Sequence, residues 1–261
     1  MNCWGEPGLR NGVNREQALK VLIIIPAYNE AGNIERVIDH IVKNYPQYDY
    51  VVVNDGSKDN TRDICRSRGY EYLNLSINLG IGGAVQTGYK YAKDKDYDVA
   101  VQIDGDGQHD IAYLEKMLKF LEKGEADIVI GSRFIEKEGF QSSVARRTGI
   151  KILSGLIFVC TGCKIKDVTS GFRAVNKKFI KIYAENYPND YPEPEAIVSA
   201  VMHGGVIKEC PVIMRERESG TSSINFMKSV YYMIKVTLAI LICRISFGIR
   251  RDPAIKNVNI R

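Results

Sequence analysis

The sequence predicts an α/β protein with a mostly parallel sheet flanked by helices and an apolar or amphipathic helix near the C-terminus. From Lys20 onward, apolar runs rich in β-branched residues alternate with segments of helical period. The apolar runs lack the polar alternation of half-exposed strands, so both of their faces are expected to be covered, as in parallel sheets with crossover helices. Polar motifs follow directly after three of these runs, at the strand ends where such sheets bind ligands.

Strands and helices are expected to alternate through the first half of the chain. The predicted strands span Val21–Ile25, Tyr50–Val53, Tyr70–Leu75, Val99–Ile103 and Ile128–Ile130. The predicted helices span Ala31–Lys43, Asn60–Arg68, Gly83–Lys93 and Ile111–Lys123.

A chain of 261 residues suits one large α/β domain with a short appendage. We expect a flexible lead over residues 1–19, which has no apolar core of a signal peptide, and the main domain over residues 20–224. The appendage, residues 225–261, is expected to hold a membrane-surface or interface helix and a basic tail.

Composition excludes some functions. The net charge of +5 is small and no basic patch is interleaved with aromatic residues, so nucleic acid is not an expected partner. The six cysteines are scattered, which favours reduced thiols in a cytosolic protein. Cys160 and Cys163 have the spacing of a zinc or redox pair, but no second pair supplies the other ligands.

The most informative motif is Asp104-Gly-Asp106, which follows the buried strand predicted at Val99–Ile103. Two carboxylates this close repel each other unless a cation lies between them. Hard divalent cations prefer oxygen ligands, so Mg²⁺ or Mn²⁺ is expected here. The same spacing also occurs in simple turns, and the rest of the chain must decide between the two readings.

Two further strand ends carry polar residues. Pro26 ends the first strand because it has no amide proton, and it directs Tyr28 and Glu30 across the strand tips. Tyr28 can offer its ring and hydroxyl to a base or ribose, while Glu30 can orient a hydroxyl or serve the first turn of a helix. After the second strand, Asp55 can accept a proton from the imide or amide edge of a nucleobase, or form a turn.

The glycine-rich segment Asn78–Gly83 lacks the spacing of a dinucleotide fingerprint. It is consistent with a helix start close to a diphosphate.

Together these residues resemble the family 2 glycosyltransferases of the GT-A fold, from Lys20 to about Ile245, and among them the polyprenyl-phosphate sugar synthases such as dolichol-phosphate mannose synthase. The matching segments, in order, are Ile25–Glu30, Asn54–Ser57, Asn78–Ala84, Asp104–Gln108, Ile130–Arg133, Thr169–Arg173 and Glu216–Gly220. Gly105, Gly107, Gln108 and Ser223 depart from the usual mannose synthase pattern, as does the proline-rich Tyr191–Glu195. The donor sugar and nucleobase are therefore left open.

The resemblance implies a role for each site residue. The nucleoside would be held by Pro26, Tyr28, Glu30, Val53 and Asp55. Asp104 and Gly105 would reach the ribose and diphosphate, and Asp106 with Gln108 would bind Mg²⁺ or Mn²⁺. Arg133 and Arg217 would lie against the phosphates or the acceptor, and Asp106, Arg133 and Arg217 would be the catalytic residues.

The expected reaction is inverting, metal-dependent transfer of a sugar from a nucleotide sugar to an undecaprenyl or dolichyl phosphate. A lipid phosphate is already an anion and needs no general base. One alternative is transfer to a sugar hydroxyl of a lipid-linked or cell-surface glycan, for which Asp167 or Glu195 is the nearest candidate base. Another is a noncatalytic nucleotide-sugar binding subunit.

Two apolar segments suggest where a lipid acceptor docks. Arg146 and Arg147 precede the apolar segment Ile150–Val159, and Phe226–Ile245 is apolar almost all round. Lys235 within the second segment disfavours a true membrane span, so this helix is expected to be buried, in a dimer interface or in a membrane surface. Basic residues toward the C-terminus suit anionic headgroups, namely Arg244, Arg250, Arg251, Lys256 and Arg261. We expect a peripheral enzyme at the cytoplasmic face of a membrane, with a homo-oligomer or a membrane partner protein as further possibilities.

Overall fold

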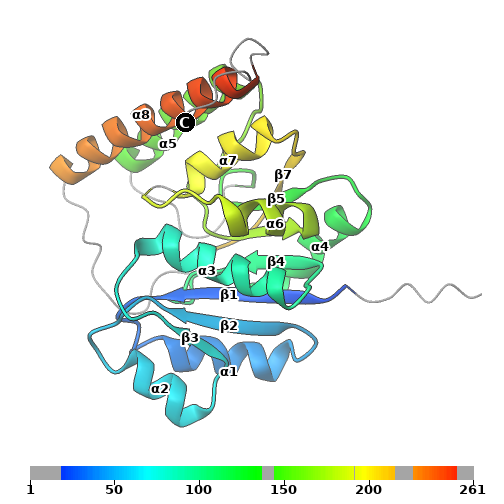
Figure 1. Ribbon diagram of the computed structural model, residues 1–261, viewed down its shortest axis with the longest axis vertical. Coiled ribbons are helices and arrows are strands. Elements are labelled where there is room, and N and C mark those ends of the chain that lie inside the picture. The colour runs from blue at the N-terminus through cyan, green and yellow to red at the C-terminus, as the bar shows by residue number, and fades with distance from the viewer. Residues whose placement is uncertain (1–18, 137–143, 191, 215–225, 252–261) are drawn as a thin grey trace, which may run out of the picture.

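The computed structural model describes residues 19–136, 144–190, 192–214 and 226–251. Within these residues seven strands form one sheet, with the order β3-β2-β1-β4-β6-β5-β7 (Figure 1). The strands are β1 (Val21–Ala27), β2 (Asp49–Asn54), β3 (Tyr72–Asn74), β4 (Val99–Gln102), β5 (Ile128–Ser132), β6 (Arg173–Asn176) and β7 (Ile207–Pro211). The helices are α1 (Ile34–Asn44), α2 (Thr61–Arg68), α3 (Gly80–Asp94), α4 (Leu114–Glu122), α5 (Val144–Thr161), α6 (Lys177–Glu185), α7 (Pro192–Met202) and α8 (Phe226–Arg251), with a short 3₁₀ turn at Ile111–Tyr113 before α4.

The sheet is mostly parallel, as the sequence predicts. β1 lies between β2 and β4 and pairs with both in parallel, and β2 pairs in parallel with β3. β6 is inserted between β4 and β5 and runs antiparallel to both, while β5 pairs in parallel with the edge strand β7. The carboxyl ends of β1, β2 and β4 therefore meet at one edge of the sheet.

Both faces of the sheet are covered, which explains why its central strands are uniformly apolar. Leu22 and Ile24 of β1 face a core built with α3, α5, α6, α7 and α8. Ile23 and Ile25, on the other face of the same strand, belong to a core built with α1 and α4. All seven residues of β1 are buried, and burying one such side chain stabilises a fold by about 1.5–3 kcal/mol.

Element ends differ from the predicted ones by a few residues. The third strand is confined to Tyr72–Asn74, and α1 begins at Ile34 because the preceding residues form a turn rather than a helix. α3 begins at Gly80, three residues before the predicted start. These shifts leave the predicted order of elements in the first half unchanged.

Helices α5 and α8 pack together on α7, at the end of the molecule opposite α1 and α2 (Figure 1). Val236 and Ile240 of α8 are fully buried, so one face of this helix belongs to the core. On the other face, Leu238 and Ile242 are 53% and 62% exposed. No helix in the described part of the chain is long and apolar enough to cross a membrane.

Candidate active site

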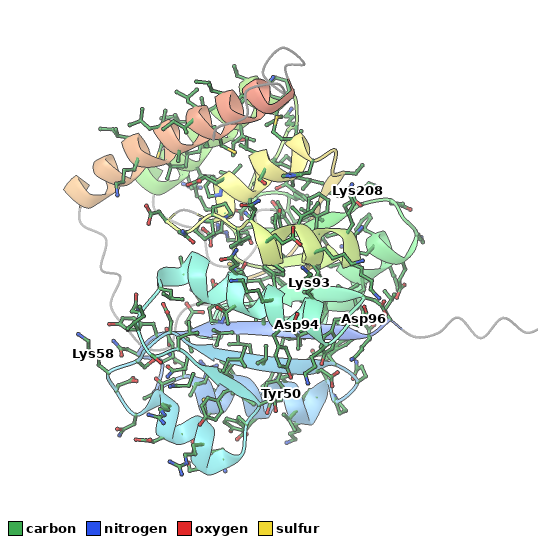
Figure 2. The ribbon with its side chains drawn as sticks, in the orientation of Figure 1. Tyr50, Lys58, Lys93, Asp94, Asp96 and Lys208 are labelled. Atoms are coloured by element: carbon green, nitrogen blue, oxygen red, sulfur yellow. The ribbon has the colours of Figure 1, made fainter. Side chains whose placement is uncertain are left out.

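A pocket of about 410 Å³ opens at the carboxyl ends of β1, β2 and β4. In Figure 2, Lys58 in the loop after β2 marks this edge of the sheet, and Asp94 and Asp96 before β4 mark the opposite edge. The pocket is lined by Pro26, Ala27, Tyr28, Glu30, Asp55, Asn78, Gly80, Ile81, Ala84, Asp104, Gly105 and Asp106. Three motifs that are far apart in the sequence thus meet in one cleft.

The loops after β1 and β2 are joined by hydrogen bonds. The backbone N–H of Asn29 donates to Oγ of Ser57 at 3.0 Å, and the N–H of Lys58 donates to Oδ1 of Asn29 at 2.8 Å. Asn29 adopts a left-handed conformation with φ of 57°, which an asparagine tolerates better than most residues. This turn places Tyr28 at the pocket with 43% of its surface exposed, so its ring is available for stacking.

Glu30 serves the turn before α1 and also lines the pocket. Its Oε2 accepts a hydrogen bond from Nδ2 of Asn33 at 2.8 Å, just before α1, and its carboxylate also lines the pocket. A Cβ on Gly105 would lie 3.5 Å from Cγ of Glu30 and 3.1 Å from the carbonyl oxygen of Pro26. Glycine therefore lets the loop after β4 approach the end of β1 closely.

Asp55 is 3% exposed, and three hydrogen bonds fix it. Its N–H donates to the carbonyl of Ala27 at 2.9 Å, and its own carbonyl accepts from Nδ2 of Asn78 at 3.1 Å. Its side-chain Oδ1 accepts from the N–H of Leu79 at 2.7 Å, at the start of α3. The carboxylate is therefore held in one orientation at the wall of the pocket.

Asp104 is held between His109 and Gly171. Its N–H donates to Nδ1 of His109 at 3.0 Å, which places the imidazole proton on Nε2, 3.6 Å from Oδ2 of Asp104. The buried His109 ring stacks on Phe172 with ring centres 5.2 Å apart, and its Nε2 forms no hydrogen bond with the described residues. A Cβ on Gly171 would lie 2.6 Å from Oδ1 of Asp104. His109 is therefore a support for Asp104, and Asp110 caps the 3₁₀ turn before α4.

Asp106 is 4% exposed and lines the pocket. Its Oδ1 accepts from the N–H of Gln108 at 3.0 Å, and its carbonyl accepts from the guanidinium of Arg36 at 3.3 Å. Gly107 has φ of 78° and would place a Cβ 2.8 Å from that guanidinium.

The described residues contain no cluster of three or more His, Cys, Asp or Glu side chains suited to a metal. Two carboxylates with the Gln108 amide still supply the oxygen donors that a hard divalent cation prefers.

Arg133 lies just after β5 and is paired with Asp167. Its Nε and Nη2 each donate to the carboxylate at 2.7 Å, and its N–H donates at 3.1 Å. Nη2 also donates to Oγ1 of Thr169 at 3.0 Å. Burial acts to lower the pKa of Arg133, but the hydrogen bonds and charge of Asp167, together with the charge of Asp104, raise it overall.

Other predicted residues lie away from the pocket lining. Val53 is fully buried in the core beside Pro26, and Gln108 and Arg133 are not among the lining residues. Glu195 lines a second pocket between α7 and α8, together with Asp190 and Lys235. Arg217 and the rest of the Glu216–Gly220 motif lie outside the described residues.

Sequence reasoning did not single out Glu193 at the start of α7. Burial raises the pKa of its carboxyl group; the positive charge of Arg173 opposes this, and the charge of Asp104 adds to it. Arg173 is itself 2% exposed and donates to the carbonyls of Ser170 and Val168. The proline-rich sequence around Glu193 does not show that its carboxyl group lies near the buried Arg173.

Comparisons with known proteins show the family to which the chain belongs. Residues 22–183 match the family model "Glycosyl transferase family 2", and the chain belongs to this family and is a glycosyltransferase. The UDP-N-acetylglucosamine–dolichyl-phosphate N-acetylglucosaminyltransferase of Methanococcus voltae is 30% identical over 215 residues, covering 74% of this chain and 84% of that protein. The undecaprenyl-phosphate mannosyltransferase of Micrococcus luteus is 28% identical over 219 residues, covering 79% and 88%.

A solved structure shares the GT-A architecture. Glucosyl-3-phosphoglycerate synthase from Mycobacterium tuberculosis, in complex with Mn²⁺, UDP and glucosyl-3-phosphoglycerate, matches with a TM-score of 0.65 and 19% identity. The match covers 93% of this chain and 86% of that one.

Proposed function

We propose that this glycosyltransferase transfers a sugar from a nucleoside diphosphate sugar to a polyprenyl phosphate, with inversion at the anomeric carbon. The observation that carries the proposal is the pocket in which Tyr28 and Asp55 lie opposite the Asp104-Gly-Asp106 loop. An aromatic face and a hydrogen-bond acceptor suit a nucleoside, and the carboxylate pair suits the metal that accompanies a diphosphate. The two relatives named above act on dolichyl and undecaprenyl phosphate, which supports the acceptor class.

The donor is oriented by residues of three strand ends. Tyr28 stacks on the base and Asp55 accepts its N–H, while Pro26, Glu30 and the backbone at Val53 shape the nucleoside side of the pocket. Asp104 and Gly105 are proposed to contact the donor between its ribose and its diphosphate. Stacking of a base on an aromatic side chain contributes about 1–3 kcal/mol.

Asp106 and Gln108, with Asp104 beside them, would hold Mg²⁺ or Mn²⁺. When bound, the cation neutralises charge on the diphosphate that leaves. Arg133 and Arg217 are the proposed cationic contacts to phosphate. Asp167 holds the guanidinium of Arg133 in one place, so that no reorganisation is required when charge develops.

The structure supports a phosphate acceptor over a hydroxyl acceptor. A hydroxyl needs a base, and Asp167 and Glu195 are the two candidates from the sequence. Asp167 is fully buried and occupied by Arg133, and Glu195 lines the second pocket instead of the donor pocket. A phosphate oxygen attacks as an anion and needs neither residue. The noncatalytic alternative has no support, since the family and the named relatives are glycosyltransferases.

Helices α5 and α8 supply the surface for a lipid acceptor. Both present large apolar side chains that are at least 39% exposed: Ile152, Phe158, Val159, Ile234, Leu238, Leu241, Ile242 and Ile245. An apolar patch of this kind, on a helix whose other face is buried, suits insertion into the boundary of a bilayer. We propose that the enzyme binds a membrane peripherally through this patch, and that the membrane face is the cytoplasmic one.

The proposal is tested by incubating the purified enzyme with a panel of labelled nucleotide sugars and a polyprenyl phosphate. Label that moves into the organic phase and is released by mild acid supports the reaction. Absence of lipid-linked label with every donor, in the presence of Mg²⁺ and Mn²⁺, would refute it.

A further inference from the structure

We propose that Arg36 of α1 is a positioning residue for the divalent cation, because it holds the loop that carries both proposed metal ligands. The inference rests on the proposed function, since it assumes that Asp106 and Gln108 bind Mg²⁺ or Mn²⁺. It goes further by giving a role to a side chain of a different element, which is not among the described residues that line the donor pocket.

Arg36 reaches the loop after β4 from a rigid element. It lies in the first turn of α1, and Ile34, Ile38 and Ile41 of the same helix are fully buried in the core on this face of the sheet. From there Nη2 of Arg36 donates to the carbonyl oxygen of Asp106 at 3.3 Å. The guanidinium is thus presented by a helix whose position is fixed by packing.

The guanidinium of Arg36 also lies against Gly107. A Cβ on Gly107 would lie 2.8 Å from Nη2, 2.9 Å from Nη1 and 3.2 Å from Cζ of Arg36, so all three atoms are close to the glycine. A side chain at position 107 would displace the guanidinium from the carbonyl of Asp106. The glycine therefore permits this contact between α1 and the loop.

The peptide between Asp106 and Gly107 has two accessible orientations. Gly107 has φ of 78°, and glycine adopts positive and negative φ about equally readily. Rotation of the peptide plane would turn the Asp106 carbonyl away from α1 and bring φ of Gly107 to a negative value. A charged donor on that carbonyl favours the orientation that the structure shows.

The orientation of this peptide affects both proposed metal ligands. Oδ1 of Asp106 accepts from the N–H of Gln108 at 3.0 Å, which closes a turn across Gly107. Rotation of the peptide inside this turn would move the Gln108 N–H relative to the carboxylate and disturb the hydrogen bond. Arg36 thus orients Asp106 and Gln108 through the backbone, and groups that orient metal ligands contribute to metal affinity.

Two other roles for Arg36 make different predictions. A guanidinium near the site repels a divalent cation, so if its charge alone mattered, its removal would strengthen metal binding. If Arg36 contacted the diphosphate directly, its removal would weaken nucleotide binding in the absence of metal. Removal of a positioning residue instead weakens metal binding and leaves metal-free nucleotide binding unchanged.

The test is a binding comparison of the full-length wild type and Arg36→Met, which keeps the apolar stem of the side chain and removes its donors. Arg36 is exposed, so the variant should fold, and thermal unfolding checks this. The wild type is first titrated calorimetrically with UDP and with GDP, and the tighter nucleotide is used throughout, with and without Mn²⁺. Binding of Mn²⁺ is measured separately from the loss of the EPR signal of the free ion.

We expect Arg36→Met to bind Mn²⁺ about tenfold more weakly, the lower end of the effect of removing a group that orients a metal ligand. Its affinity for nucleotide without metal should equal that of the wild type. Lysine can still donate to the carbonyl of Asp106, so Arg36→Lys should bind Mn²⁺ more tightly than Arg36→Met. Arg66→Met, which removes an exposed guanidinium from α2, is the matched control and should bind Mn²⁺ like the wild type.

Unchanged or tighter Mn²⁺ binding by Arg36→Met would overturn the assignment and leave the proposed function standing. The same holds if metal-free nucleotide affinity falls as much as Mn²⁺ affinity, or if Arg36→Lys is no better than Arg36→Met. If the wild type itself binds nucleotide no more tightly with Mn²⁺ than without it, the metal site of the proposed function fails together with the inference.

Discussion

Arg133 and Asp167 form a buried ion pair with two parallel hydrogen bonds of 2.7 Å, linking the end of β5 to the loop before β6. The side chain of Asp167 is fully buried and that of Arg133 is 10% exposed. Glu209 of β7 accepts from the N–H of Asp167 at 2.9 Å, so the pair is fixed from a second strand. Protein groups alone therefore hold the guanidinium of Arg133 in place, without a bound substrate.

Asp167→Asn should reduce both stability and catalysis. It removes the charge opposite a buried guanidinium, and breaking a buried pair from one side costs about 3–5 kcal/mol. Denaturant unfolding should show this loss, and kcat should fall because the guanidinium is no longer held. Asp63→Asn, which alters an exposed carboxylate, is the control. Wild-type stability of Asp167→Asn would show that the pair contributes little to the fold.

Gly171→Ala should impair the donor site with little effect on the fold. The added Cβ would lie 2.6 Å from Oδ1 of Asp104, so the carboxylate must turn away from its position at the pocket. We expect kcat/KM to fall at least about tenfold, as displacement of a positioned group does. Gly155→Ala in α5, where a Cβ would meet no atom within 4 Å, should keep full activity and stabilise the helix by about 0.5–1 kcal/mol.

Wild-type behaviour of Gly171→Ala would contradict the role proposed for Asp104. If the variant binds nucleotide and turns over like the wild type, the Asp104 carboxylate has room to move and its present position is not required for activity. Thermal unfolding of the variant, measured alongside, separates this outcome from a general loss of structure.

Much of the fold can be predicted from the first half of the sequence, because a buried parallel strand is a run of apolar residues that needs no partner to be recognised. The second half is harder. β6 has four residues and begins with the buried Arg173, which reads as polar, and it runs antiparallel to its neighbours. β7 is an edge strand with Lys208 and Glu209 partly exposed, so it lacks the uniformly apolar pattern. α6 does carry a local signal, since Asn176 caps it and Phe179, Ile180, Tyr183 and Ala184 are buried at helical spacing, but no helix is predicted there. α7 begins in the proline-rich segment and is buried almost all round, so it shows no amphipathic pattern.

Some features of the candidate site could be predicted from the sequence, and others could not. Tyr28, Asp55 and Asp106 directly follow strands, and strand ends are where a parallel sheet gathers its ligands, so their position at one pocket could be predicted. The support of Asp104 by His109 could not, because it depends on a loop that folds back on itself and on the stacking of His109 against Phe172. Nor could a sequence pattern show that Oδ1 of Asp55 is occupied by Leu79.

Charges on the exposed face of α8 should detach the enzyme from lipid. We expect Leu238→Glu with Ile242→Glu to reduce flotation with anionic liposomes at least about fivefold, since both side chains are more than half exposed and each charge would have to be desolvated on insertion. Nucleotide binding should be unchanged. Val42→Glu, on the exposed side of α1 at the other end of the molecule, is the control. Undiminished flotation of the double variant would exclude this face as the membrane contact.

The proposed acceptor is the phosphate of a polyprenyl chain, and one comparison tests this assignment most directly. Transfer of labelled sugar is measured with a polyprenyl phosphate and with the polyprenol of the same length, which differs only in lacking the phosphate. Asp106→Asn, which removes a proposed metal ligand and should lose at least about a hundredfold in rate, serves as the enzyme blank. We predict acid-labile labelled lipid from the phosphate and none above the blank from the alcohol. Equal labelling of the alcohol, or label found only on soluble sugar hydroxyls, would contradict the account.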